Sequence, residues 1–314
     1  MPENEEYKKF GSTDFLMLLT ILFWGVNYSF VKLALADLTP YAFNGLRLFI
    51  STLILLLVLW ISGEGFSLPR EGILKAVAIS LIGNTIYQIL FIQGINRTTA
   101  SNTALILAMS PVFIAVLSSY VLRERIHWAG WMGIFISFIG LYFVISKQAG
   151  YFNFSSQTLR GDLMILFANI CWAVYTVFSK PFLEKISPLK FTTLTLAIGT
   201  LFFLPFSVKD IGEIQWQRVS FKAWASFSYS TLFAIVICFI IWYASVKRVG
   251  SSKTGIYGNL TPVVAVSFAS IFLGEKISIF QVWGALIILF GVYLTRSGYR
   301  WFERKKGLTK KFVT

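Results

Sequence analysis

The sequence predicts an all-α integral membrane protein whose ten transmembrane helices form two inverted five-helix repeats around a central cavity. Three observations predict this fold. First, 56% of the 314 residues are hydrophobic and only 13% are charged, whereas soluble globular proteins average roughly 45–50% and about 25%. Second, apolar runs of about 20 residues, the length that crosses a bilayer as a helix, recur along the whole chain. Third, the chain repeats itself, with an odd number of such runs in each copy.

Ten apolar runs have the length of a transmembrane helix. In chain order they are 14–35, 41–62, 73–95, 101–122, 128–146, 160–183, 190–208, 223–246, 253–273 and 279–297. The connections between them are short, so no extramembrane domain is expected. Glutamates precede the first run and no small-residue cleavage site follows it, which favours a retained helix over a signal peptide.

Lysines and arginines are distributed unequally between the two sides of the predicted bundle. The side that holds both termini and the even-numbered connections carries about 19 of them, and the other side about eight. The positive-inside rule therefore places both termini in the cytoplasm. We assign the net charge of +14 to this topology signal and, in the basic C-terminal tail 299–314, to attraction by anionic lipid headgroups. No nucleic-acid partner is expected.

The second half of the chain repeats landmarks of the first half. Trp24 and Lys32 recur 148 positions later as Trp172 and Lys180. Later in each half the shift becomes 151 positions. The residues that recur as the same residue type at this distance are Ser101, Thr103, Pro111, Glu124, Gly133, Gly140 and Tyr142. Because five spans per copy is an odd number, the second copy starts from the opposite face of the membrane. The predicted units are two inverted repeats, 1–148 and 149–298, with a substrate site between them near the midplane.

These landmarks resemble the EamA-type, ten-helix members of the drug/metabolite transporter superfamily. The resemblance is carried by Trp24-Gly25, Lys32, Arg47, the stretch from Thr99 through Pro111 to Arg123-Glu124-Arg125, Gly250-Ser251-Ser252, Thr261-Pro262 and Gly274-Glu275-Lys276. It implies a basket of helices around a cavity, drawn chiefly from the first, third, fourth, sixth, eighth and ninth spans. It also implies a bacterial inner-membrane protein whose relatives export amino acids and other small metabolites or, more distantly, carry nucleotide sugars or lipid-linked sugars.

Polar and aromatic residues on the central spans form the candidate substrate pathway. They are Trp24, Asn27, Tyr28, Lys32, Asn84, Tyr87, Gln88, Trp172, Tyr175, Trp242 and Tyr257. The amides are the most informative members, because an amide that faced lipid would lose its hydrogen bonds. Asn84 and Gln88, four residues apart, share a helix face. Two alternatives remain open: amides also bond neighbouring helices, and aromatic rings also serve in packing or in the interfacial belt.

Lysines and arginines within the spans are few. Lys32, one helical turn beyond Tyr28, is the residue that we expect to meet an anionic group such as a substrate carboxylate, with snorkelling from a helix end as the alternative. Arg47 is expected to act as a structural tether for carbonyl groups or a neighbouring helix. A nucleotide sugar or a phosphorylated substrate would need several cations at the midplane, and the central spans do not supply them.

Paired prolines and glycines indicate how the helices bend and pack. Pro111 and Pro262 occupy matched mid-span positions, where each would kink its helix, so they are candidate gating hinges, with a static bend as the alternative. Glycines spaced by seven residues mark one face of the fifth and tenth spans, and they are Gly133, Gly140, Gly284 and Gly291. We expect them to allow close packing within the monomer, with a homodimer interface as the alternative.

Reactive and titratable groups are scarce in the predicted spans. Every acidic residue falls in a tail, a connection or the end of a span, with Asp14 and Asp162 terminal, and His127 lies in a connection. Two cysteines cannot form a disulfide framework or a four-ligand zinc site. We therefore predict no enzyme activity, no metal and no cofactor. Proton-coupled carriers normally use a buried carboxylate or histidine, so facilitated transport is expected, with sodium bound by backbone carbonyls as the alternative.

The predicted function is secondary transport of a small-molecule substrate through a midplane cavity by alternating access. Amino acids or other amphipathic compounds are the expected substrates, since the candidate pathway is rich in aromatic rings and amides. The alternative within transport is a flippase for a lipid or a lipid-linked sugar. The alternative from another class is an intramembrane transferase, which the scarcity of acids and histidines disfavours.

Overall fold

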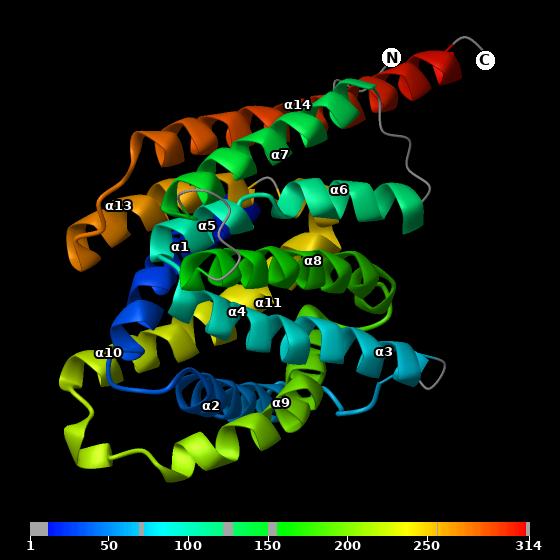
Figure 1. The fold of residues 1–314 in the computed structure, drawn as a ribbon. Coiled ribbons are helices and arrows are strands. Elements are labelled where there is room, and N and C mark those ends of the chain that lie inside the picture. The colour runs from blue at the N-terminus through cyan, green and yellow to red at the C-terminus, as the bar shows by residue number, and fades with distance from the viewer. Residues whose placement is uncertain (1–11, 69–71, 122–127, 150–155, 256, 312–314) are drawn as a thin grey trace.

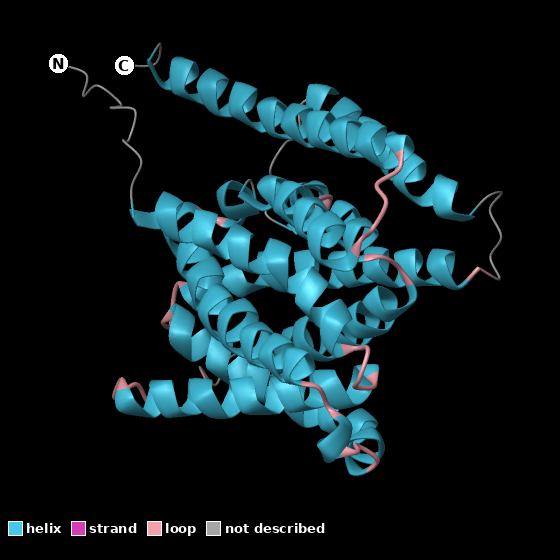
Figure 2. Ribbon diagram, turned by 90° about the vertical axis from the view of Figure 1, so that its left-hand side faces the viewer, coloured by secondary structure: helices cyan, strands magenta, loops and turns pink. Residues whose placement is uncertain are grey.

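The computed structural model describes residues 12–68, 72–121, 128–149, 156–255 and 257–311, and within these ranges every regular element is a helix (Figure 1, Figure 2). The first half contains α1 (Ser12–Ala34), α2 (Pro40–Ile61), α3 (Ile73–Ser80), η2 (Leu81–Ile86), α4 (Tyr87–Arg97), α5 (Ala100–Leu107), α6 (Ser110–Val121) and α7 (Trp128–Ala149). The second half contains α8 (Gln157–Leu183), α9 (Pro188–Gly212), η3 (Trp216–Arg218), α10 (Phe221–Tyr229), η4 (Ser230–Ile237), α11 (Cys238–Val249), α12 (Ser251–Gly255), η5 (Tyr257–Leu260), α13 (Thr261–Leu273) and α14 (Ile279–Lys311).

These elements combine into the ten predicted spans. Among the described residues, eight helical segments are long and apolar enough to cross a membrane, and the described parts of the last two spans, Thr261–Leu273 and Ile279–Thr295, are shorter apolar helices. The prediction of an all-α membrane protein with ten spans is confirmed. The tenth span was predicted to end at residue 297, but α14 continues as a helix to Lys311.

Matched capping residues begin the second span of each half. Thr39 caps α2 by accepting a hydrogen bond from the backbone N–H of Ala42 at 3.3 Å. Ser187 caps α9 by accepting one from the N–H of Lys190 at 3.0 Å. A proline follows each cap, at a position where its missing N–H costs no helical hydrogen bond.

The third and eighth spans each contain a π-helical segment near the middle. η2 lies between α3 and α4, and η4 lies at the matched place between α10 and α11. In η2 the Thr85 hydroxyl donates to the carbonyl of Gly199 at 2.9 Å. A Cβ atom added at Gly199 would lie 2.2 Å from the Cβ of Asn84, so α9 approaches η2 through a position that only glycine fits. Such segments often occur at functional sites.

The fourth and ninth spans are broken rather than kinked, which corrects the prediction at Pro111 and Pro262. The fourth span is divided into α5 and α6, and the ninth into α12, η5 and α13. Each proline lies in the first turn of the helix after the break, where it interrupts no hydrogen-bond ladder. The hydroxyl of Ser110, just before Pro111, lies 2.6 Å from the carbonyl oxygen of Leu107 and helps to satisfy the end of α5.

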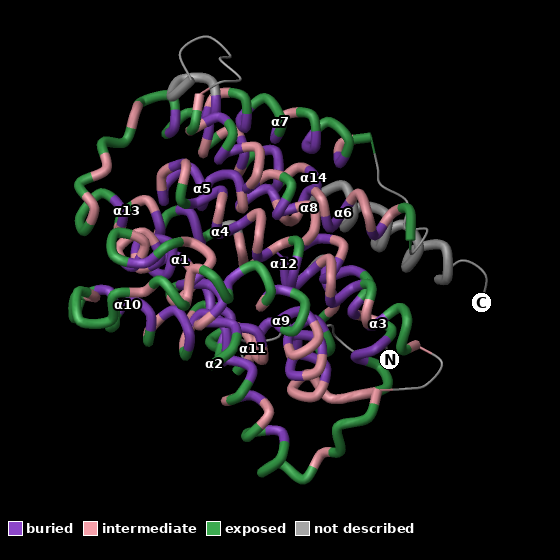
Figure 3. The backbone as a smooth tube through the Cα atoms, turned by 60° about the horizontal axis from the view of Figure 1, so that its bottom comes forward, coloured by how far each residue is buried: buried purple, intermediate pink, exposed green. Residues whose placement is uncertain are grey.

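The two halves are intertwined. α1 packs against α10, α11 and α13, and α8 packs against α4, α5 and α6, so the first helix of each half lies against the third and fourth spans of the other. α2 packs against α9, where Thr52 and Thr200, which are 148 positions apart, share a hydrogen bond of 2.9 Å. Figure 3 shows buried residues on helix faces turned toward the interior and exposed residues along the outside.

α7 and α14 lie side by side as an outer layer (Figure 1). A Cβ atom added at Gly133 would lie 2.3 Å from the backbone N of Thr295, and one at Gly291 would lie 2.6 Å from the carbonyl oxygen of Gly133. Gly140 and Gly284 face each other one heptad away in the same manner. The glycine faces noted in the sequence are therefore used in close packing between these two helices of one chain.

Candidate functional site

A pocket lies where the two halves meet, and the space between its lining atoms, including the part open to solvent, is about 780 Å³. Its walls come from α1, α2, α4, α5 and α6 of the first half and from α8, η4, α11, α12, η5 and α13 of the second. The position matches the predicted location between the repeats.

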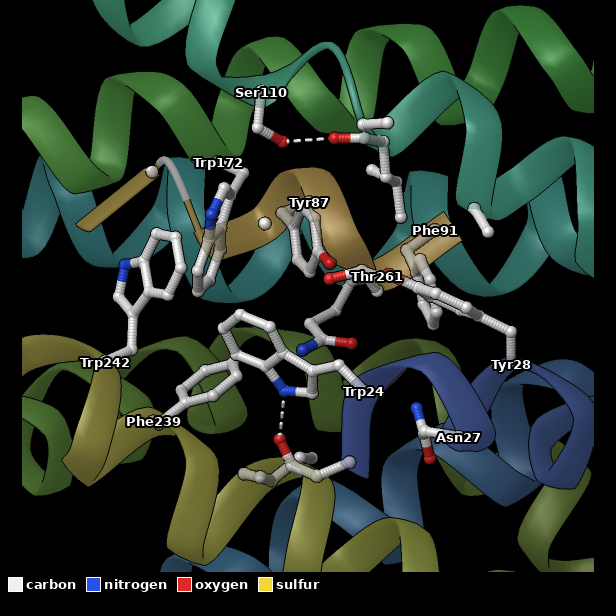
Figure 4. Close-up of a pocket in the computed structure, with 18 of the residues that line it drawn as sticks. Trp24, Asn27, Tyr28, Tyr87, Phe91, Ser110, Trp172, Phe239, Trp242 and Thr261 are labelled. Atoms are coloured by element: carbon white, nitrogen blue, oxygen red, sulfur yellow. Dashed lines mark hydrogen bonds between the residues drawn. The ribbon is translucent and has the colours of Figure 1, made fainter. Parts of the chain in front are cut away.

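Seven of the residues predicted for the substrate pathway line this cavity. They are Trp24, Asn27, Tyr28, Tyr87, Gln88, Trp172 and Trp242. Figure 4 shows Trp242 and Phe239 on one side of the view, Tyr28 and Phe91 on the other, and Trp24 between them. The helical spacing of Trp24 and Tyr28 therefore does place both rings on the face of α1 that borders the cavity.

Four other predicted residues lie outside the lining. The Lys32 ammonium group donates to the carbonyl of Asn96 at the end of α4, at 3.4 Å. Tyr175 is fully buried, with its hydroxyl 2.5 Å from that of Thr195. Asn84 packs in η2 against α9. Tyr257 donates a hydrogen bond to the carboxylate of Asp14 near the start of α1.

The two candidate hinge prolines also lie outside the lining, but each has a neighbour in it. Ser110 and Thr261, the residues just before Pro111 and Pro262, both line the cavity. The breaks in the fourth and ninth spans therefore border the cavity directly. A change of angle at either break would change the shape of the wall.

An aromatic wall formed by both halves dominates the cavity. Trp24 and Trp172, equivalent positions of the two repeats, meet edge to face with ring centroids 5.7 Å apart. The Trp242 ring lies 5.1 Å from that of Trp24, and the Tyr87 ring lies 5.5 Å from that of Trp172. The Trp24 indole N–H donates to the carbonyl of Ala234 in η4 at 2.8 Å, which fixes its orientation (Figure 4). Such a wall suits a flat or apolar body.

Arg47 forms a polar corner of the cavity, although the sequence predicted only a tether. Its guanidinium group donates to the Ser230 hydroxyl at 2.8 Å, the Asn44 side-chain oxygen at 2.5 Å and the Gln88 side-chain oxygen at 3.1 Å. These bonds do connect α2 to α4 and η4, as a tether would. Yet Arg47 also lines the cavity, and it is the one charged residue among the lining residues.

The remaining lining residues had no distinctive signal in the sequence. They are small or apolar and include Ala104, Leu107, Ala108, Ile235, Phe239, Gly255 and Gly258. In a chain with 31 phenylalanines, the hydropathy of a residue does not distinguish a cavity wall from a helix contact or a lipid-facing surface. Proximity to the breaks in the fourth and ninth spans is the signal that could have found several of them.

Asp162 corrects the expectation that the acidic residues at span ends lie outside the core. It is in the second turn of α8, and its side chain is fully buried. The Thr98 hydroxyl donates to its carboxylate at 2.5 Å, and the Asn102 amide donates to both of its oxygens at 3.1 Å. Gln281 of α14 in turn donates to the side-chain oxygen of Asn102 at 2.8 Å. The cavity lining does not include Asp162.

The chemistry of the cavity is that of a binding site. Its lining combines aromatic faces, two amides, one guanidinium group and the hydroxyls of Ser110 and Thr261, and the described lining residues include no carboxylate, histidine or cysteine. Over the described part of the chain, no group of three or more His, Cys, Asp or Glu side chains could hold a metal ion. The lining can surround a small amphipathic molecule and orient it through a few polar contacts.

Comparisons with known proteins agree with this architecture. The model of the EamA-like transporter family matches residues 11–146 and 159–297. The chain is 30% identical over 295 residues to the uncharacterized transporter YyaM of Bacillus subtilis, covering 90% of this chain and 93% of that protein. It is 29% identical to an uncharacterized transporter of Archaeoglobus fulgidus, covering 91% and 98%. A solved crystal structure with 17% sequence identity covers 93% of this chain and 99% of its own, with a TM-score of 0.66, which shows a common fold.

Proposed function

The chain belongs to the EamA-like transporter family of membrane transporters, and from this premise we propose that it carries small amphipathic metabolites through the cavity between its halves. Amino acids and compounds of similar size and character are the proposed substrates. The observation that carries the proposal is the aromatic wall, because it is built from equivalent positions of the two repeats, Trp24 and Trp172, at the place where they meet.

Alternating access is the proposed mode of movement. The broken fourth and ninth spans border the cavity, and the π-helical segments η2 and η4 lie in the third and eighth. At such a break the two helical pieces can change their relative angle while each piece keeps its own backbone hydrogen bonds. Pro111 and Pro262 begin the helices after two of the breaks, so these prolines are the proposed hinges.

The protein is a multi-pass integral membrane protein. A bacterial inner membrane with both termini cytoplasmic is the proposed location and orientation, on the strength of the lysine and arginine distribution. The basic tail after residue 298 is proposed to bind anionic headgroups. Binding and release without covalent chemistry is proposed for the cavity, since its lining offers no nucleophile with a positioned base.

The substrate is proposed to move down its own concentration gradient by facilitated transport. Carboxylates and histidines normally carry a coupled proton, and neither group occurs among the described residues of the cavity lining. If transport were coupled to protons, Asp162 would be the group that carries the proton, because it is buried beside the central helices. The expectation is that an imposed pH gradient leaves the initial flux unchanged. Strong stimulation that disappears in Asp162→Asn would contradict the proposal and identify Asp162 as the coupling group.

Counterflow in proteoliposomes tests the transport proposal. Vesicles are loaded with an unlabelled aromatic amino acid, an aromatic monocarboxylate or an aromatic amine, and uptake of the labelled compound is followed. The wild-type protein is expected to accumulate label with at least one of these compounds. Trp24→Ala is expected to reduce that flux by about tenfold or more, because a large contact surface at the centre of the site is lost.

Trp60→Ala is the matched control, because this tryptophan lies on the outer surface of α2 and is 68% exposed. Its flux is expected to equal that of the wild type, with both variants showing the same elution profile and unfolding temperature as the parent. Equal flux in Trp24→Ala and Trp60→Ala would show that the substrate pathway does not run along the aromatic wall. No counterflow with any compound class would contradict the proposed substrates.

A further inference from the structure

We propose that Arg47 binds the anionic group of the transported molecule, a carboxylate, and that the aromatic wall holds the apolar body attached to it. This inference rests on the proposed transport function and adds a substrate class to it: small organic anions with an aromatic or apolar body. It reassigns Arg47 from a tether to a residue that contacts substrate.

The charge of Arg47 has no counter-ion in the described part of the chain. The residue is 2% exposed, and its polar partners are a hydroxyl and two amide oxygens. All of these partners are neutral, so they orient the guanidinium group without cancelling its charge. A buried charge without a partner of opposite sign is costly in a membrane protein. An anion that enters the cavity supplies the missing charge.

A tether alone does not need a cation. A neutral donor such as glutamine would connect α2 to Ser230 and Asn44 without the cost of burying a charge. Arginine is instead the side chain whose planar fork matches the two oxygens of a carboxylate. The Nε atom of Arg47 has no hydrogen-bond partner among the described residues, so the group has an unused donor.

The aromatic wall leads to Arg47. The four rings of the wall follow one another from Trp242 through Trp24 and Trp172 to Tyr87, and the Phe91 ring continues the row. Successive ring centroids are 5.1 to 5.7 Å apart. The guanidinium carbon of Arg47 then lies 6.0 Å from the centroid of the Phe91 ring. A molecule with an apolar body and one terminal carboxylate therefore meets rings along its length and a cation at its end.

The remaining polar atoms of the lining refine this picture. The side-chain oxygen of Asn27 and the indole N–H of Trp242 are buried and have no hydrogen-bond partner among the described residues. Both line the cavity, so each offers a contact to a polar group on the body of the ligand. One guanidinium group matches a single carboxylate, whereas a phosphorylated or multiply charged molecule would need further cations.

A pair of ligands that differ only in charge tests the inference. The purified full-length protein in detergent is titrated with 3-phenylpropionate and with its neutral amide, and quenching of tryptophan fluorescence reports binding. The wild type is expected to bind the carboxylate at least about tenfold more tightly than the amide, because only the carboxylate pairs with the buried cation. A wild-type protein that binds both equally overturns the inference, whatever the variants do.

Arg47→Gln separates charge pairing from folding. It is expected to bring the ratio of the two dissociation constants close to one while binding of the amide is retained, and Arg47→Lys is expected to keep part of the preference. Lys32→Gln is the matched control, since Lys32 is the other candidate for an anionic group and lies outside the lining. Its ratio is expected to equal that of the wild type. A preference that survives Arg47→Gln, or that disappears in Lys32→Gln, overturns the inference.

The outcome can be distinguished from failure of the transport proposal. Counterflow of amines or neutral compounds, with no preference for carboxylates in binding or flux, overturns the role of Arg47 and leaves transport intact. Selective binding of carboxylates that depends on Arg47, without counterflow of any compound, supports the anion site and contradicts transport.

Discussion

At the scale of single residues, the two buried charges of the described chain are held in different ways. The Asp162 carboxylate accepts three hydrogen bonds from Thr98 and Asn102, which satisfy both of its oxygens. The Arg47 guanidinium group also makes three, yet it retains an unused donor and borders the cavity. We therefore assign Asp162 to the support of the helix bundle and Arg47 to the binding of ligand.

Asp162→Asn is expected to lower the free energy of unfolding by about 1–3 kcal/mol, because the new amide would turn a donor toward the Thr98 hydroxyl or the Asn102 amide. Thermal unfolding in detergent checks this. Asp210→Asn is the control: Asp210 also accepts a hydrogen bond, from Thr39 at 2.7 Å, but at an exposed position. Its effect is expected to stay within about 0.5 kcal/mol. Equal unfolding temperatures for the two variants would exclude a structural role for the Asp162 network.

Residue types alone predicted only part of the site. Trp24, Tyr87 and Trp172 were found because an aromatic or amide group in the middle of an apolar helix is an unusual feature. The sequence located Arg47 in the second span and Asp162 near the start of the sixth. It did not predict that Arg47 lines the cavity or that Asp162 is buried. Burial of Asp162 depends on α4, α5 and α14, which reach it only in the assembled bundle.

At the scale of elements, backbone geometry departs from regular helix where the cavity lies. Hydropathy predicted ten spans because a π-helical turn or a short break leaves the apolar character of a run unchanged. It could not predict η2 or η4, whose neighbours belong to distant parts of the chain: in η2, the Thr85 hydroxyl donates to the carbonyl of Gly199 in α9. The α7 and α14 pair was predictable, because its contact surface is a repeated glycine spacing that remains visible in the sequence.

Gly133→Ala is expected to destabilise the protein by about 1–3 kcal/mol, since its Cβ would press on backbone atoms of α14 that cannot move independently. Gly212→Ala is the matched control. Gly212 ends α9, and an added Cβ would meet nothing within 4 Å there. That variant is expected to be neutral or to gain up to about 1 kcal/mol from helix propensity. The measurement is thermal unfolding, and a neutral Gly133→Ala would show that α7 and α14 can separate without loss.

At the scale of the whole molecule, duplication is the feature that made the architecture predictable. The shifts of 148 and 151 positions pair α1 with α8, α2 with α9 and α7 with α14. The structure repeats the caps Thr39 and Ser187 at the offset of 148, and its π-helical segments begin 149 positions apart. The sequence did not predict which helices of one half pack against which helices of the other. The repeat identifies the counterpart of each helix but not the helices beside it.

Inversion of the halves has a direct test in labelling from one side of the membrane. Gly65→Cys and Gln215→Cys, introduced into a protein with Cys171→Ala and Cys238→Ala, mark the corresponding connections after α2 and α9. A membrane-impermeant maleimide is expected to label Gln215→Cys in intact cells and Gly65→Cys only after permeabilisation. Labelling of both from the same side would contradict inversion. The reverse pattern would keep inversion and contradict the proposed orientation.

The crossing of α1 into the second half has a consequence for biogenesis. The main neighbours of α1 are α10, α11 and α13, which begin only at Phe221 and are made late in translation. A nascent chain with only its first five spans inserted therefore has α4 and α5 beside α1 but lacks the main neighbours of that helix. The bundle around α1 can therefore close only after the eighth and ninth spans have been made, and a prematurely terminated product would lack that part of its wall.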